Sequence, residues 1–206
     1  MPTINDAKKE IQFKIVYYGP ALSGKTTNLI YIHSRFDPAL RGDLISLATA
    51  ADRTLFFDFL PVNAIVIQGF KTKFQLYTVP GQVIYNGTRQ LVLRNVDGVV
   101  FVADSEWEKM PENVESFRNL EENLAKINLG FERVPYVLQY NKRDLENVAS
   151  TEYLQFLLNN RKRHVPSFEA VALSGRNVFS TLDALTQILL RRFNQEQMHM
   201  RSIQSR

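Results

Sequence analysis

Eight consecutive residues constrain the fold of this chain most. Residues 19–26 read Gly-Pro-Ala-Leu-Ser-Gly-Lys-Thr, which fits the pattern G-x-x-x-x-G-K-[ST]. A β-rich run, residues 11–18, precedes them, and a helical pattern over residues 25–34 follows. A glycine-rich loop between a strand and a helix directs backbone N–H groups at phosphate oxygens. The loop therefore predicts a bound nucleoside triphosphate without naming its base.

The rest of the chain alternates strand and helix patterns. Apolar residues at steps of three and four predict two helices, through Val114, Phe117, Leu120, Leu124 and Ile127 and through Val178, Leu182, Leu185 and Leu189. Further strands are predicted at residues 65–70, 74–79, 98–104, 135–140 and 168–173, the first two as a hairpin. We expect an α/β P-loop NTPase fold with a doubly wound, mostly parallel six-stranded sheet and one antiparallel edge strand.

Composition narrows the class of protein. The chain has 206 residues and a net charge of +4, which suits one domain and gives no reason to expect nucleic acid binding. It has no cysteine, which excludes disulfides and thiolate metal sites. No apolar run is long enough to span a membrane, and we expect a cytoplasmic protein. We expect an N-terminal extension over residues 1–9, one domain over residues 10–193 and a fraying polar tail over residues 194–206.

The loop residues have distinct expected roles. Lys25 supplies a cation near the β- and γ-phosphates, and the Thr26 hydroxyl can bind Mg²⁺. The residues expected to contact the phosphates are Gly19, Ala21, Leu22, Ser23, Gly24, Lys25, Thr26 and Thr27.

A second motif indicates which base is bound. Asn141, Lys142 and Asp144 follow an apolar strand. The Asp144 carboxylate can accept hydrogen bonds from both N1–H and the exocyclic amine of guanine, whereas adenine would leave it unpaired. Lys142 can lie over the base with its stem, and Asn141 can tie neighbouring loops together. The alternative is an ordinary polar loop after a strand.

Thr78, Gly81 and Gln82 follow another strand and resemble the D-x-x-G-Q element of Ras-like GTPases. In that element the glycine amide contacts the γ-phosphate and the glutamine orients the attacking water. Thr78 stands where aspartate is usual, so Asp52 or Asp58 is expected to supply the missing charge. A plain Pro-Gly turn is the alternative.

The segment between the first helix and the second strand has the place of a switch loop. Thr54 is the expected ligand of Mg²⁺ and γ-phosphate, and Arg53 is either an arginine finger in cis or a surface arginine. Residues 55–61, rich in phenylalanine, form a buried strand or an apolar partner surface. At Ala172, a backbone amide that binds the guanine carbonyl oxygen in Ras-like proteins and a plain strand end are both open.

These segments together resemble the bacterial mutual gliding-motility protein A family of Ras-like GTPases. The resemblance is carried by residues 14–20, 52–61, 69–72, 76–82 and 140–144. It implies a GTP/GDP switch with Mg²⁺ that sets cell polarity and directs motility. It also implies threonine at position 78, catalysis by Arg53 with Gln82 and Lys25, and a roadblock-fold activating dimer that rearranges residues 45–85. The GTP form is expected at a cell pole.

One position departs from the family pattern. The family loop usually has glycine where this chain has Ala21, and a methyl group there can crowd the transition state without blocking nucleotide binding. Two functions follow as hypotheses: a slow GTPase stimulated by a partner, and a GTP-dependent binding module with little turnover. An ATP-dependent P-loop enzyme such as a kinase is a third, but it leaves Asp144 unexplained.

Overall fold

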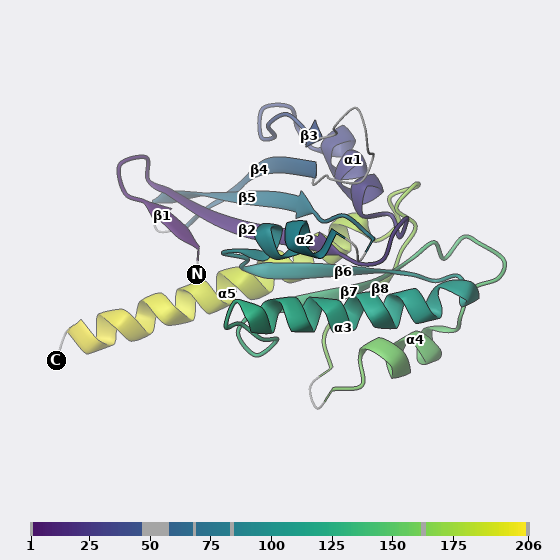
Figure 1. The fold of residues 1–206 in the computed structure, drawn as a ribbon. Helices are drawn as coiled ribbons and strands as arrows, with labels where there is room; N and C mark the ends of the chain where they lie inside the picture. The colour runs from purple at the N-terminus through teal and green to yellow at the C-terminus, as the bar shows by residue number, and fades with distance from the viewer. Residues whose placement is uncertain (1, 47–57, 68, 83–84, 162–163, 205–206) are drawn as a thin grey trace.

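The computed structural model describes residues 2–46, 58–67, 69–82, 85–161 and 164–204. Strands and helices alternate along it (Figure 1). The strands are β1 (Thr3–Asn5), β2 (Glu10–Tyr18), β3 (Ile45–Ser46), β4 (Asp58–Ile67), β5 (Phe70–Thr78), β6 (Gly98–Asp104), β7 (Tyr136–Asn141) and β8 (Ser167–Glu169). The helices are α1 (Lys25–Arg35), α2 (Asn86–Leu93), the 3₁₀ helix η2 (Trp107–Lys109), α3 (Met110–Lys126), α4 (Thr151–Leu158) and α5 (Val178–Gln204).

The strands form one mixed sheet in the order β3-β4-β5-β2-β6-β7-β8, with β1 paired to β2. The pairs from β5 through β8 are parallel, which confirms the doubly wound, mostly parallel sheet. The predicted hairpin is also present, since β4 and β5 pair antiparallel on either side of Gly69.

The described sheet has eight strands, so it adds two short strands to the six expected. The two additions are β1, which pairs antiparallel with β2, and β3, which pairs antiparallel with β4. Strands of two or three residues show no usable hydrophobic alternation, so the sequence pattern cannot reveal them. β1 also places the expected N-terminal extension within the sheet.

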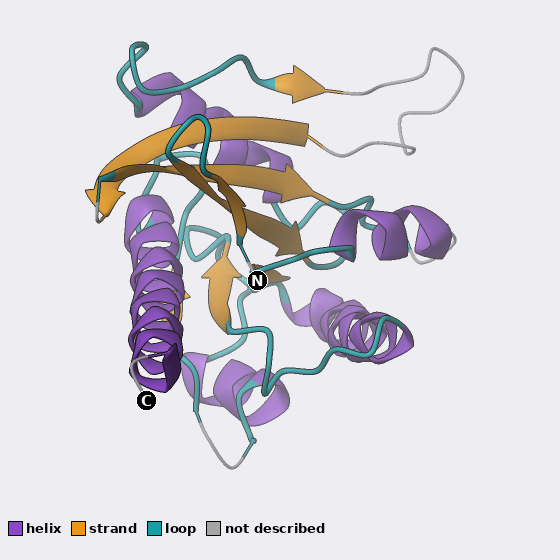
Figure 2. Ribbon diagram, turned by 90° about the vertical axis from the view of Figure 1, so that its left-hand side faces the viewer, coloured by secondary structure: helices purple, strands orange, loops and turns teal. Residues whose placement is uncertain are grey.

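Each face of the sheet is covered by its own helices (Figure 2). Along β2, Ile15 and Tyr17 pack with α1 and α5, whereas Val16 and Tyr18 pack with α2, α3 and α4. This alternation follows from the two-residue period of a strand. Burial on both faces explains why β6 and β7 consist mostly of apolar residues.

Helix α5 extends past the expected domain end. The sequence predicts fraying after Phe193, but α5 continues to Gln204 and projects beyond the sheet (Figure 1). Residues 194–204 contain neither glycine nor proline and several good helix formers, so nothing local ends the helix. Among the described residues, no helix has the length and apolar character needed to cross a membrane.

The topology determines where the motifs meet. β2 has β5 on one side and β6 on the other, so the chain reverses its direction of winding at β2. In such sheets, ligands bind at the carboxyl ends of the strands beside this reversal. The loops after β2, β5, β6, β7 and β8 therefore share one end of the sheet, and they contain the predicted site residues.

Candidate functional site

The loop after β2 has two positions whose backbone conformation and close packing require glycine. Gly19 has a φ of 146° and Gly24 a φ of 98°, both conformations that favour glycine. A Cβ on Gly19 would overlap the Val102 carbonyl, and one on Gly24 would overlap the Asn141 amide. The loop is thus packed tightly between β6 and the end of β7. Leu22 also has a positive φ of 60°, and its side chain is 86% exposed.

Helix α1 begins in a form suited to an anion. Its N-cap is Gly24, no side-chain hydrogen bond caps it, and its first turn has no acidic residue. The N-terminus of such a helix favours phosphate. Lys25 is buried, and its Nζ lies 3.1 Å from the Gly19 carbonyl oxygen and 2.5 Å from that of Pro20. The ammonium group is therefore held over the loop.

Thr26 is the predicted magnesium ligand that lies within the described residues. It is exposed in the first turn of α1, beside the predicted phosphate position. Within the described part of the chain, no cluster of three His, Cys, Asp or Glu side chains could hold a metal ion. A hydroxyl oxygen fits a hard cation whose remaining ligands are waters and phosphate oxygens.

Asn141 ties three loops together, as the sequence predicts. Its Nδ2 donates to the Ser23 carbonyl at 2.8 Å, and its Oδ1 accepts from the Ala172 backbone N–H at 2.8 Å. One buried side chain thus connects the phosphate loop with the loops after β7 and β8. The Ala172 amide, which Ras-like proteins direct at guanine, is here bonded to Asn141.

Lys142 forms ion pairs with two acidic side chains, which the sequence does not reveal. Its Nζ is 2.6 Å from Asp104 Oδ2 and 2.7 Å from Glu106 Oε1. Burial opposes the charge on Lys142, but the two carboxylates outweigh it and raise its pKa. Burial raises the pKa of Asp104, although Lys142 opposes the shift. Lys142 follows the end of β7 and has a φ of 65°, in the left-handed region of backbone conformation.

Asp144 is exposed and stands in the turn that follows. The Leu145 N–H donates to the Lys142 carbonyl at 3.2 Å and closes this turn. The Arg143 backbone N–H donates to the Ala170 carbonyl at 3.1 Å, and the Arg143 side chain contacts Glu169. The carboxylate of Asp144 is therefore held on an anchored loop with its side chain accessible to a ligand.

The segment after β5 lies against the phosphate loop. Thr78 ends β5 and is buried, whereas Gln82 is exposed. A Cβ on Gly81 would overlap the backbone of Ala21. Only glycine permits this approach, so the structure brings together the two positions at which the sequence predicts γ-phosphate contacts and crowding.

Several predicted residues cannot be placed. Asp52, Arg53 and Thr54 lie outside the described residues, so their roles as charge donor, arginine finger and magnesium ligand stay predictions. Of residues 55–61, the last four lie in β4, and residues 55–57 lie outside the described residues; whether this segment is a buried strand or an apolar partner surface stays a prediction.

Sequence reasoning missed two residues beside the site. Asp104 had a usable signal, because a charged residue that ends an apolar strand at the ligand end of the sheet is unusual. Arg89 had none, because one arginine in a short helix matches no motif. It is fully buried and donates to the carbonyls of Pro80 and Gly81.

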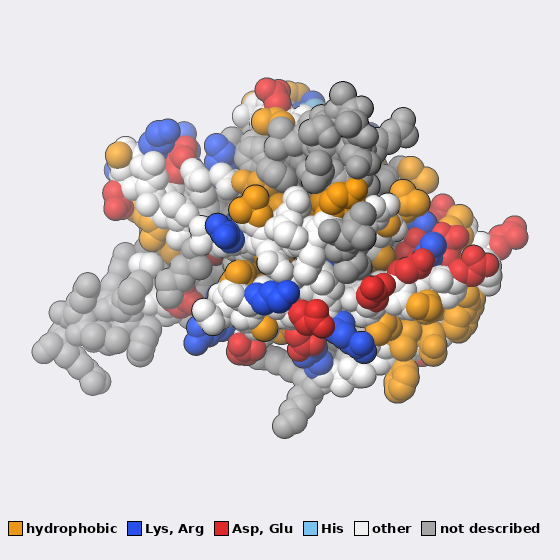
Figure 3. All heavy atoms as spheres, in the orientation of Figure 1, with side chains coloured by type: hydrophobic (Ala, Val, Ile, Leu, Met, Phe, Trp, Pro, Cys, Tyr) orange, Lys and Arg blue, Asp and Glu red, His pale blue; other side chains and the backbone are white. Residues whose placement is uncertain are grey.

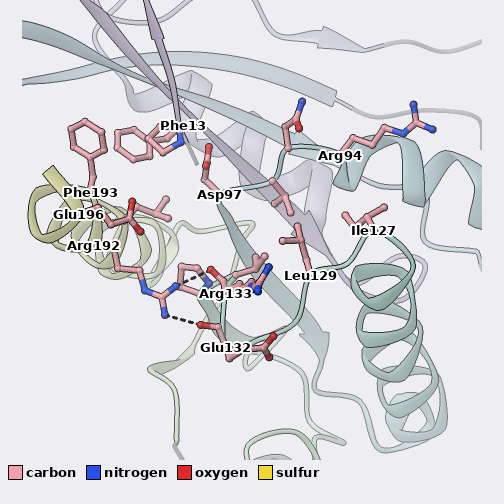
Figure 4. A pocket seen from close by; sticks show the side chains of 16 residues that line it. Phe13, Arg94, Asp97, Ile127, Leu129, Glu132, Arg133, Arg192, Phe193 and Glu196 are labelled. Carbon is pink, nitrogen blue, oxygen red and sulfur yellow. Dashed lines mark hydrogen bonds between the residues drawn. The ribbon is translucent and has the colours of Figure 1, made fainter. Parts of the chain in front are cut away.

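A hollow of about 740 Å³ lies at the other end of the sheet (Figure 4). Asp97 and Pro135 line it, and they immediately precede β6 and β7, so it sits at the amino ends of the strands. Arg192 crosses its wall and donates to the Glu132 and Arg133 carbonyls. None of the residues that line it is a predicted site residue. The candidate site is therefore the region where the motifs meet, at the carboxyl ends of the strands.

An apolar patch lies beside α4 (Figure 3). Trp107, Tyr153 and Phe156 are exposed, and the rings of the first two are 5.0 Å apart. Trp107 follows Glu106, so the patch borders the Lys142 side of the site without including a predicted site residue.

Comparison with known proteins agrees with this geometry. Residues 14–191 match the Ras family. The chain is 53% identical over 190 residues to the mutual gliding-motility protein MglA of Myxococcus xanthus (strain DK1622), covering 92% of this chain and 96% of that protein.

Proposed function

The chain belongs to the Ras family, and we propose that it is a GTPase switch that binds GTP and GDP with Mg²⁺. The observation that carries the proposal is the Asn141 tie, because it joins a phosphate-binding loop to a guanine-reading loop through two hydrogen bonds of 2.8 Å. A kinase-like ATP site would have no use for Asp144 at this position.

Phosphate binding falls to the loop and the start of α1. The positive end of the α1 dipole, the loop N–H groups and the Lys25 ammonium all favour the charge of the β- and γ-phosphates. Thr26 would hold Mg²⁺ with Thr54 as a second protein ligand. The ion, when bound, neutralises charge that develops on the phosphates.

Guanine recognition falls to Asp144 and Lys142. The Asp144 carboxylate accepts from N1–H and the exocyclic amine, and the Lys142 stem covers the base. The contacts of Lys142 with Asp104 and Glu106 hold the stem in one place, which lowers the ordering cost of binding. The Ala172 amide can reach the guanine oxygen only by sharing or leaving its bond to Asn141.

Hydrolysis requires a water held in line with the γ-phosphate. Gln82 orients this water, the Gly81 amide contacts the γ-phosphate, and Arg53 stabilises the charge of the transition state. We propose that the rate is low for the chain alone and rises when a roadblock-fold dimer arranges residues 45–85.

The cellular role is proposed from the relative's name, mutual gliding-motility protein MglA. We propose that the chain is a cytoplasmic switch in bacterial polarity or motility and that partners recruit it to a cell pole in the GTP form.

Single-turnover GTP hydrolysis, with and without a roadblock-type partner, tests the proposal. We expect slow phosphate release alone and a rise of about 10³-fold or more with the partner, the range of known arginine-finger systems. Tight GTP binding without phosphate release under either condition would leave only the binding-module hypothesis.

A further inference from the structure

The guanidinium of Arg89 in α2 is fully buried and forms contacts in three directions. Nε donates to the Pro80 carbonyl at 2.8 Å, and Nη2 donates to the Gly81 carbonyl. Nη1 donates to Asn119 Oδ1 at 2.6 Å and to the Tyr18 hydroxyl at 3.4 Å. The guanidinium carbon also lies 5.0 Å from the centre of the Tyr18 ring.

No acidic side chain among the described residues forms an ion pair with Arg89. A buried charge without an opposite charge is costly unless many hydrogen bonds compensate it. An apolar side chain of similar size would fill the same space at lower cost. What the guanidinium provides and an apolar side chain cannot is therefore a set of directed hydrogen bonds.

Two asparagines of α3 support the arginine, Asn119 by a direct hydrogen bond and Asn123 through the Tyr18 hydroxyl. Asn119 Oδ1 accepts from the Tyr18 hydroxyl at 2.6 Å as well as from Arg89. Asn123 Nδ2 donates to the Tyr18 hydroxyl at 3.1 Å and to Asn86 Oδ1 at 2.6 Å. The array joins β2, α2 and α3, so the guanidinium has little freedom to turn.

The bonds to Pro80 and Gly81 determine two peptide planes. In a trans peptide, C=O and N–H point in opposite directions. When Arg89 holds the Pro80 carbonyl, the Gly81 N–H must point away from Arg89. Gly81 also lies against Ala21 of the phosphate loop, so its amide is fixed beside the predicted γ-phosphate position. The hydrogen bond to the Gly81 carbonyl fixes the next peptide plane, which carries the backbone N–H of Gln82.

We infer that Arg89 is a positioning residue for γ-phosphate recognition and hydrolysis, acting through the Pro80 and Gly81 carbonyls on the Gly81 amide and the Gln82 side chain. The inference rests on the proposed function. Arg89 then contributes to the difference in affinity between GTP and GDP, whereas the Asn141 tie and Asp144 contribute to the binding of both nucleotides.

The test compares Arg89→Lys with the wild-type chain. Lysine keeps the charge but cannot bond both carbonyls and Asn119 in one plane. We expect the affinity for GTPγS to fall about 10-fold and single-turnover hydrolysis to fall between 10- and 100-fold, on the order expected for a misplacement of about 1 Å. The affinity for GDP should stay within about 2-fold, because its contacts are elsewhere.

Two further variants separate positioning from general stability. Arg118→Lys makes the same change at an exposed arginine of α3 and should alter neither affinity nor rate. In a Gln82→Ala background, Arg89→Lys should cost less hydrolysis rate than in the wild-type chain, since the part of its effect that acts through Gln82 is already lost. Thermal unfolding of each GDP-bound variant shows whether it is folded.

Equal losses of GDP and GTPγS affinity in Arg89→Lys would overturn the inference and indicate a merely structural arginine. A full additional rate loss in the Gln82→Ala background would also overturn it. A wild-type chain that binds neither nucleotide would instead overturn the proposed function, and the inference with it.

Discussion

The two halves of the site are held by different kinds of interaction. The base half is held by charge and by the Asn141 tie: Lys142 is paired with Asp104 and Glu106. The γ-phosphate half is held by one buried arginine that bonds neutral carbonyls and amides. Charge pairs that exist before binding favour affinity in every nucleotide state. The hydrogen bonds of Arg89 to two backbone carbonyls instead orient the Gly81 amide, the group expected to contact the γ-phosphate.

The largest effect is expected from Asp144→Asn in the base half. Two hydrogen bonds from guanine to a charged acceptor are each worth about 1.5–3 kcal/mol, so GDP affinity should fall about 10²- to 10⁴-fold. The affinity for xanthine nucleotides should rise, since the new amide can donate a hydrogen bond to the C2 carbonyl of xanthine. Competition binding measures both, and Glu146→Gln, at a nearby exposed carboxylate, is the matched control. Retained guanine preference would contradict the role of Asp144.

Asn141→Ala should break the tie between the loops. It removes two hydrogen bonds of 2.8 Å and leaves a carbonyl and an N–H unpaired, at a cost of about 2–4 kcal/mol in free energy of unfolding. GDP affinity should fall with it. Asn159→Ala is the control, because Asn159 is equally buried and bonds the backbone of Val165 far from the site motifs. Urea unfolding should show a loss of stability in both variants, whereas GDP titration should show a loss of affinity in Asn141→Ala alone.

Ala21→Gly examines the γ-phosphate half. If the methyl group crowds the transition state beside Gly81, its removal should raise single-turnover hydrolysis by about 10-fold and leave GDP affinity unchanged. Ala39→Gly, in an exposed loop, controls for the general effect of a glycine. An unchanged rate would remove the binding-module hypothesis that rests on Ala21.

The smallest expected effect is the pH dependence of Lys142. Its pKa is raised in the folded chain, so its contribution to stability is complete below the unfolded value of about 10.5 and is lost as pH rises through the folded value. Lys142→Gln should cost about 1 kcal/mol at pH 7, and the difference from wild type should shrink above about pH 10.5. Lys109→Gln removes an exposed pair with Glu112 and should matter less. A pH-independent difference would contradict the charge pairing.

Local signals in the sequence were enough for the elements that position the site. Glycine, lysine and threonine spacing located the loop, and apolar runs located β6 and β7. The Asn141 tie was also predictable, because its residue type and its place after a strand suit hydrogen bonding between loops.

Features that depend on distant contacts could not be predicted. Arg89 acquires its role from Tyr18 and Asn119, which are 71 and 30 residues away in the chain. The short strands β1 and β3 form only because β2 and β4 offer edges for pairing. Helix α5 passes Phe193 because helix propensity, rather than apolar spacing, continues it.

The comparison of GDP with ADP tests the central claim most directly. Competition against a fluorescent GDP analogue, with Mg²⁺ present, gives both dissociation constants for the wild-type chain. The geometry of Asp144 and Asn141 predicts that GDP binds at least about 10³-fold more tightly, because adenine would leave the carboxylate unpaired. Equal affinities for GDP and ADP would contradict a guanine-nucleotide switch.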